Sequence, residues 1–191
     1  MPVQRTITLY SIDELEGRAR EAALDSVRLT YGDLVHEREA EINNDLNKDL
    51  LVIGIRAQAN VVADAYNNCR ATIGRKAKII DGAALLKKAG LKPTVERVDG
   101  LQGCILSESG SVEAGDDDPT VLRLDDDSNS IALPEGEEEK VFRAIAKILG
   151  YAAAELAEDV ETMQTDEWAL ATCEANEILF TVAGQYAGSR S

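Results

Sequence analysis

Apolar and polar residues alternate at the start of the chain. Within residues 3–10, Val3, Ile7 and Leu9 lie on one side of an extended backbone, with polar residues between them. Alternation with a period of two is typical of a strand that buries one face. The pattern therefore predicts a half-buried strand at this end of the fold.

A change to helical spacing follows immediately. In residues 11–29, apolar side chains recur at intervals of three and four, which is the period of an amphipathic helix. Ser11 precedes Glu14 by three residues, and such a pair forms a capping box in which each side chain accepts a backbone N–H. The sequence thus predicts this helix and the residue at which it begins.

The rest of the pattern is mostly helical. A polar stretch with a narrow apolar seam predicts an exposed helix at residues 31–48, and the far more apolar residues 50–73 are interpreted as the central helix of the core. Further helices are expected at residues 81–89, 135–163 and 165–176, the last of them capped by Thr165. Strands are expected as a pair at residues 94–100 and 101–108 and as a second pair at residues 120–125 and 130–133, with a hairpin at residues 177–187. These elements predict a helix-rich α+β fold, in which several helices cover a small antiparallel sheet, built as a single domain of residues 1–191.

One segment carries most of the negative charge. Residues 108–139 contain twelve acidic residues and one basic residue, Arg123, in a chain whose formal charge is −15. We expect this segment to form an acidic β-hairpin or loop inserted into the domain. Because carboxylates pair with Lys and Arg, the segment is predicted to bind a basic protein surface. The carboxylates assigned this role are those of Asp116, Asp117, Asp118, Asp125, Asp126, Asp127, Glu137, Glu138 and Glu139.

Charge and composition exclude several classes of partner. A charge of −15 on 191 residues makes direct binding of nucleic acid or of an anionic membrane unfavourable, because like charges repel. The longest aliphatic run, residues 50–55, is too short to cross a bilayer, and the first residues do not resemble a secretion signal. Cys69, Cys104 and Cys173 are far apart and form no CxxC pair, so we expect buried, reduced thiols in a cytoplasmic protein.

A calcium loop is one candidate for the acidic segment. Asp125, Asp127 and Asn129 have the spacing of its first three ligands. The sixth position, normally glycine, is Ser130, and the twelfth, normally a bidentate glutamate, is Gly136. An acidic turn is therefore the preferred interpretation, and no metal or cofactor is predicted. A loose cation site shared by Asp116–Asp118 and Asp125–Asp127 stays open as an alternative if a hairpin brings the two clusters together.

Signals for catalysis are weak. The chain has a single histidine, His36, on the polar helix, and it contains neither a phosphate-binding loop nor a dinucleotide-binding glycine motif. Paired carboxylates of the glycosidase type remain open because acids are plentiful, but nothing distinguishes any two of them. We therefore expect a protein that is not an enzyme.

The two ends of the chain resemble a family of short, uncharacterised proteins encoded by tailed phages and prophages. The similar positions are Tyr10, Ile12, Asp13, Glu14 and Leu15 near the start, and Thr165, Asp166, Glu167, Glu174, Ala175 and Asn176 near the end. The resemblance covers about 45 of the 191 residues, and the middle of the chain lacks the family's Trp- and Tyr-rich segment. It implies an α+β shape and an origin in a mobile element, and it supplies no catalytic residues.

Two functions follow as hypotheses. The first is a phage- or prophage-derived acidic module that binds a protein in the host cytoplasm, inhibiting a nucleic-acid-binding defence protein by imitating the charge of DNA. The second is a virion or assembly component that forms a homo-oligomer through its alanine-rich helix, at residues 144–157. A small hydrolase is a third class, for which no site is identified.

Overall fold

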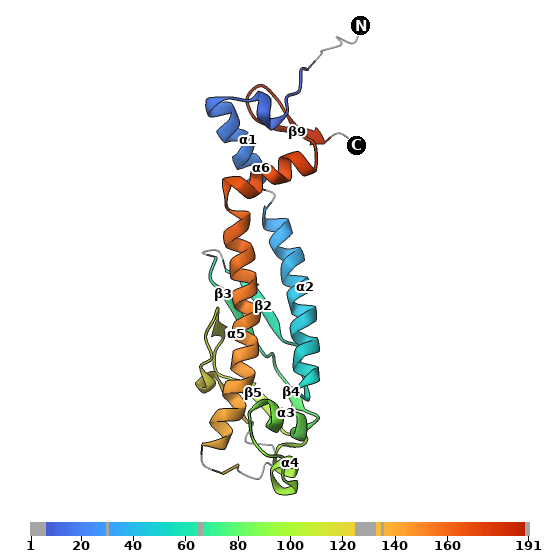
Figure 1. Cartoon of the computed structure of the whole chain (residues 1–191), viewed down its shortest axis with the longest axis vertical. Coiled ribbons are helices and arrows are strands. Elements are labelled where there is room, and N and C mark those ends of the chain that lie inside the picture. The colour runs from blue at the N-terminus through green and yellow to red at the C-terminus, as the bar shows by residue number, and fades with distance from the viewer. Residues whose placement is uncertain (1–6, 30, 65–66, 125–132, 135, 190–191) are drawn as a thin grey trace. The chain divides into compact units, whose positions relative to one another are not determined.

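The computed structural model describes residues 7–29, 31–64, 67–124, 133–134 and 136–189 (Figure 1). The chain divides into two compact units. The terminal unit contains Met1–His36 and Asp159–Ser191, and the middle unit contains Glu37–Glu158. Helices and antiparallel strands together confirm a helix-rich α+β fold.

The terminal unit combines helices from both ends of the chain with a two-stranded sheet. Its elements are a 3₁₀ helix at Ile12–Glu14, α1 (Gly17–Leu29), α6 (Asp166–Ala175), β8 (Ile178–Phe180) and β9 (Tyr186–Ser189), with the beginning of α2 (Tyr31–Val52) and the end of α5 (Glu137–Met163). One apolar core joins the 3₁₀ helix, α1, α6 and β8, and it is formed by Ile12, Leu15, Ala23, Leu24, Val27, Ala169, Cys173 and Phe180.

The predicted capping box is present, but the helix after it is interrupted. The backbone N of Ser11 donates to Glu14 Oε2 at 2.8 Å, and Ser11 Oγ donates to the same oxygen at 3.1 Å. The α-helix begins only at Gly17, whose φ of +52° is left-handed and disfavoured for other residues. The chain therefore turns between the cap and the helix that was expected to be continuous with it.

The strand expected at residues 3–10 is reduced, in its described part, to one bridge. Tyr10 and Phe180 exchange backbone hydrogen bonds of 2.9 and 2.8 Å. Ile7 and Leu9 are 70% and 39% exposed, so the prediction that they lie on a buried face is wrong. Val3 lies outside the described residues. Alternation alone did not reveal that this segment has only a short stretch of β8 to pair with.

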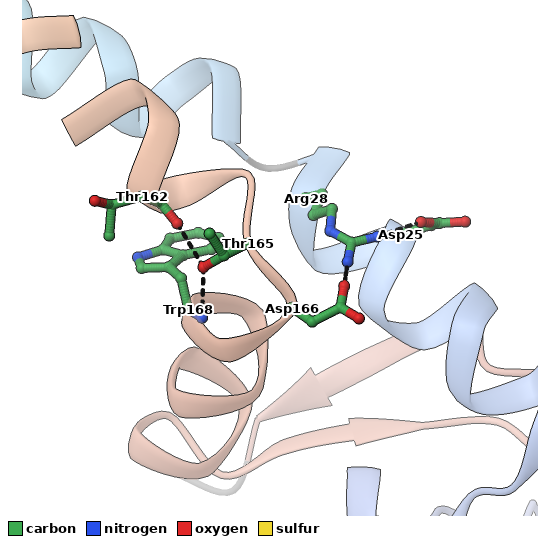
Figure 2. Close-up of polar contacts among 6 residues, drawn as sticks. All are labelled: Asp25, Arg28, Thr162, Thr165, Asp166 and Trp168. Carbon is green, nitrogen blue, oxygen red and sulfur yellow. Dashed lines mark hydrogen bonds and ion pairs between the residues drawn. The ribbon is translucent and has the colours of Figure 1, made fainter. Parts of the chain in front are cut away.

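Polar contacts fix the start of α6 in the terminal unit (Figure 2). Thr165 Oγ1 accepts the backbone N–H of Trp168 at 3.1 Å and donates to the carbonyl of Thr162 at 2.8 Å, which confirms the predicted cap. Arg28 on α1 bonds Asp25 at 2.8 Å and also pairs with Asp166 in the first turn of α6. Arg28 thus connects α1 to the N-terminal end of α6, where the helix dipole favours the negative charge of Asp166.

The middle unit contains two small antiparallel sheets and several helices. One sheet has the order β1 (Ile55–Arg56), β4 (Ala77–Ile79), β5 (Ile105–Glu108) and β7 (Leu122–Leu124), and the other has the order β2 (Asn60–Ala63), β3 (Cys69–Thr72) and β6 (Val112–Glu113). The helices are α2, α3 (Gly82–Lys88), α4 (Val95–Leu101) and α5, with a 3₁₀ helix at Pro119–Val121. In Figure 1, α2 and α5 run side by side in this unit.

The prediction of a central helix at residues 50–73 is wrong. Helix α2 ends at Val52, and Gly54 follows with a φ of +86°. A Cβ at Gly54 would lie 2.2 Å from the carbonyl oxygen of Asp81, so only glycine fits this close turn. The rest of the apolar run forms β1, β2 and β3, and the central buried helix is α5, whose Ile145 and Leu149 are fully buried.

Of the other elements predicted in this unit, some are confirmed and one is wrong. The helix predicted at residues 81–89 is present as α3, and Asp81 caps it, with its Oδ1 accepting the N–H of Ala84 at 3.0 Å. Residues 94–100 were expected to be a strand and instead belong largely to α4, because Thr94 begins a helix there. The expected strand at residues 120–125 is present as β7, but it pairs with β5. Residues 130–132 lie outside the description.

Side chains of α2 close the edge of strand β2. Glu39 Oε1 accepts the N–H of Ala63 at 2.9 Å, and Asn43 Oδ1 accepts that of Val61. Asn47 bonds both backbone groups of Ala59, at 2.9 Å each. Successive partners are four residues apart on the helix and two residues apart on the strand, which correspond to rises of about 6.0 and 6.7 Å. The helix therefore takes the place of a neighbouring strand and is fixed against the sheet.

Candidate functional site

The predicted acidic segment is only partly described, and its described portion is built into the fold. Strands β5, β6 and β7 take parts of residues 108–124 into both sheets of the middle unit. Asp125, Asp126, Asp127 and Asn129, and with them the candidate calcium loop, lie outside the described residues. The preference for an acidic turn over a calcium loop at that position therefore stays a prediction.

Asp116, Asp117 and Asp118 form a tight turn against helix α5. Asp116 Oδ1 accepts the backbone N–H groups of Asp117 at 2.7 Å and Asp118 at 3.2 Å. The N–H before this turn, on Gly115, donates to the carbonyl of Gly150 at 3.0 Å. The carboxylate of Asp116 thus stabilises its own turn, while Asp117 is exposed.

The carboxylate of Asp118 also has a local role. Its Oδ1 accepts the N–H of Thr120, and its Oδ2 accepts the Thr120 hydroxyl, both at 2.9 Å. The backbone hydrogen bond from Thr120 is the main cause that lowers the pKa of Asp118, followed by the hydroxyl, with a contribution from the charge of Arg143. Asp118 is therefore held ionised as the cap of a short 3₁₀ helix.

The three glutamates at the start of α5 differ in their surroundings. Glu137 pairs with Arg97 of α4, and its side chain is only 15% exposed. Glu139 pairs with Arg143 at 2.8 Å, one turn further along α5. Glu138 is exposed. The structure thus brings Asp118 and Glu139 to the same arginine, whereas Glu137 points into the molecule.

A groove between α2 and α5 is one of the concave sites in the described part of the middle unit. Its volume is about 290 Å³. Its apolar lining comes from Ile42, Leu46, Val52, Ile53, Ile148, Tyr151 and Ala152. Three carboxylates, those of Asp45, Asp49 and Glu155, and the ammonium of Lys88 at the end of α3, complete the lining. The groove combines an apolar floor with acids on both helices.

Two large apolar side chains remain exposed at this groove. Val52 is 78% exposed and Tyr151 is 62% exposed. The Nζ of Lys147 lies 5.5 Å from the centre of the Tyr151 ring, which places a cation over its face. Most of the ring remains accessible to another molecule.

Internal ion pairs compensate only part of the acidic lining. Lys48 pairs with Asp45 at 2.8 Å, and Arg38 pairs with Glu155 at 3.4 Å. Both pairs are solvent-exposed and therefore weak, so a partner's cations can compete with them. The carboxylate of Asp49 has no hydrogen bond or ion pair with any described residue. Asp49 is thus the most available anion in the groove.

The sequence contained a signal for one side of this site. Acidic residues recur at every fourth position of α2, at Glu37, Glu41, Asp45 and Asp49, and all four are exposed. Such a repeat places carboxylates along one helix face. Counting acids by segment drew attention to residues 108–139 instead. Glu155 on the opposite wall was not predictable, because nothing local indicates that α5 lies beside α2.

Other candidate chemistry finds little support in the described part of the chain. No group of three or more His, Cys, Asp and Glu side chains there is arranged to hold a metal ion. Cys69, Cys104 and Cys173 are buried, as expected, and none of the three forms a disulfide. Where the backbone is described, none of the helices has the length and apolar character needed to span a bilayer.

The chain matches no family model, no curated protein and no solved structure.

Proposed function

We propose that this protein is an acidic protein-binding module, encoded by a phage or prophage, that binds a basic surface of a host protein through the groove between α2 and α5. The supporting observation is the combination found there: exposed Tyr151 and Val52 above an apolar floor, with Asp45, Asp49 and Glu155 at the rims. This moves the contact surface from the segment first predicted to a different face of the middle unit.

Each component of the groove has a separate role in binding. Burial of Tyr151 and Val52 supplies affinity, and tyrosine is among the residues most often found at energetic centres of interfaces. The carboxylates select a partner that carries Lys or Arg and repel acidic competitors. An exposed tyrosine or an exposed acid alone is ordinary, and the combination in one groove favours protein binding.

The acidic segment contributes at longer range in this proposal. Asp117 and Glu138 are exposed, and the whole chain carries a formal charge of −15. Such a field accelerates encounter with a basic protein and weakens as salt is added. Proteins that bind nucleic acid have basic surfaces, which is why a host defence protein of that class is the proposed partner.

The homo-oligomer has less support. Ala146 and Ala153 of α5 are fully buried inside their own unit. These two alanines already pack within one chain and are not available to a second copy, whereas Ala144, Ala152, Ala154 and Ala157 are half-buried. Self-association therefore enters as an outcome of the experiment and not as a second proposal.

The test compares capture of host proteins by the wild type and by a groove variant that carries Asp45→Asn, Asp49→Asn and Glu155→Gln. Any captured protein is purified, and its affinity is measured by titration calorimetry at low and moderate salt. Loss of three charge contacts is expected to weaken binding at least tenfold, about 1.4 kcal/mol, and to reduce its salt dependence.

A terminal-unit variant with Glu16→Gln, Glu21→Gln and Glu161→Gln serves as the control. These three residues are exposed and the change in net charge is the same. The control is expected to bind like the wild type. If both variants weaken binding equally, only overall charge matters and the groove is not the site. If the wild type and the groove variant form the same stable oligomer and capture no basic protein, the proposal is wrong.

A further inference from the structure

We infer that the segment bound in the groove between α2 and α5 is a helix with lysine or arginine on one face, and not an extended peptide. This inference rests on the proposed function and specifies the structure of the occupant. It follows from the nature of the two walls, from the spacing of the carboxylates and from the size of the apolar floor.

Along most of their length the two walls offer side chains only. The groove is bounded mainly by α2 and α5, whose central backbone N–H and C=O groups are bonded within each helix, and its lining continues past the end of α2 with Ile53 and Lys88. An extended peptide that binds by adding a β-strand needs a strand edge to pair with its backbone groups. The edge of β2, on another face of α2, is already closed by Glu39, Asn43 and Asn47. A helix satisfies its own backbone and therefore suits these walls.

The spacing of the acids fits a parallel or antiparallel helix. Asp45 and Asp49 are four residues apart, so they are separated by about 6 Å along the axis of α2. A helix lying along the groove presents its own side chains at i and i+4 with the same rise. Two basic residues at that spacing meet Asp45 and Asp49. A third basic residue on the other flank of the helix faces Glu155.

The apolar floor admits only a few anchors. A volume of about 290 Å³ lies at the lower end of ligand-binding pockets, so one or two large apolar side chains fill it. These would pack against Ile42, Leu46 and Ile148 and cover the exposed ring of Tyr151. The occupant is thus amphipathic, with a narrow apolar stripe between basic flanks.

Synthetic peptides test the inference directly. The first is an amphipathic helix of roughly 18 residues with leucines at helical spacing and lysines at i and i+4 on both flanks. The second has the same composition with a central proline, which breaks the helix. Fluorescence anisotropy is expected to show at least tenfold weaker binding for the proline peptide, and circular dichroism a gain of helix when the first peptide binds.

Two protein variants locate the binding. The groove variant is expected to weaken the helical peptide about tenfold and to reduce the salt dependence, whereas the terminal-unit variant is expected to bind like the wild type. Val52→Lys places a cation at the groove on a side chain that is 78% exposed, so folding is unaffected while a basic helix is repelled. Binding to this variant is expected to fall by more than tenfold.

The outcomes separate this inference from the proposed function. If the proline peptide binds as tightly as the helical one, the occupant is not a helix, although a partner sensitive to the groove variant would still support protein binding there. If neither groove change affects the helical peptide, the inference fails. If those changes also leave a captured basic protein bound as before, the proposed function fails with it.

Discussion

The turn that contains Asp116 lies directly against the backbone of helix α5 at Gly150, which has no side chain. A Cβ at Gly150 would come within 1.9 Å of the Asp116 carbonyl oxygen. In the middle of a helix, Gly→Ala normally stabilises by about 1 kcal/mol. Here the methyl group meets backbone, which cannot move aside as a side chain can. Overpacking of this kind costs about 1–3 kcal/mol and exceeds the gain in helix propensity.

Gly150→Ala is therefore expected to destabilise the protein by about 1–2 kcal/mol in urea denaturation. Gly32→Ala in α2 is the matched control, because nothing lies within 4 Å of a Cβ built there. The control is expected to be neutral or stabilising by up to about 1 kcal/mol. Equal effects of the two substitutions would show that the Asp116 turn does not depend on the missing side chain.

At the scale of elements, the contact between α2 and β2 depends on amide side chains. Ala59 is buried, and Asn47 pairs with both its N–H and its C=O. A buried backbone group that loses its partner costs about 1–3 kcal/mol. The same loss also opens a strand edge, which is a template for pairing with another chain. The ladder of side chains from α2 thus stabilises the sheet and shields its edge.

Asn47→Leu keeps the size of the side chain and removes its hydrogen-bonding groups. We expect a loss of about 2–4 kcal/mol in unfolding free energy and concentration-dependent self-association in sedimentation experiments. Asn44→Leu is the control, since Asn44 is an exposed neighbour on the same helix. Its effect is expected to stay within about 0.5 kcal/mol. A similar loss in both variants would indicate a general effect on α2 rather than on the ladder.

The sequence predicted elements best where the deciding contacts are local. The caps at Ser11 and Thr165 were predicted because each involves partners three residues apart. The end of α2 was missed because the fit of Gly54 against Asp81 is a tertiary contact. Pairing of β7 with β5, and the meeting of α2 with α5, also join distant parts of the chain. The acidic face of α2 could therefore be predicted from the sequence, but the groove that it lines could not.

At the scale of the whole molecule, both segments from which a phage protein family was hypothesised fall in the terminal unit. Ile12 and Leu15 from the start share a core with Ala169 and Cys173 from the end. The groove and residues 108–139 belong to the middle unit. The part of the chain on which that hypothesis rests is thus distinct from the part proposed to bind a partner, and the two units can differ in stability.

The cysteines report on each unit separately. Burial raises the pKa of Cys173 in the terminal unit and of Cys69 in the middle unit, and the charges of Glu39 and Asp64 add to the effect at Cys69. Folding therefore keeps both thiols protonated and covered, while an unfolded thiol recovers its ordinary pKa near 9.0 and reacts. Since the pKa of each thiol is higher in the folded than in the unfolded state, the protonated thiols make their full contribution to stability below pH 9. This contribution is lost as the pH rises above that value.

Brief alkylation with iodoacetamide at pH 8 and increasing urea, read by mass spectrometry for each cysteine, tests whether the units unfold together. Because each unit has its own apolar core, we expect Cys173 and Cys69 to become reactive at different urea concentrations. Cys104 lies in the middle unit and is expected to follow Cys69. A single midpoint for all three thiols would instead support the single domain predicted from the sequence. It would also mean that a destabilising substitution in the groove lowers the stability of the whole chain.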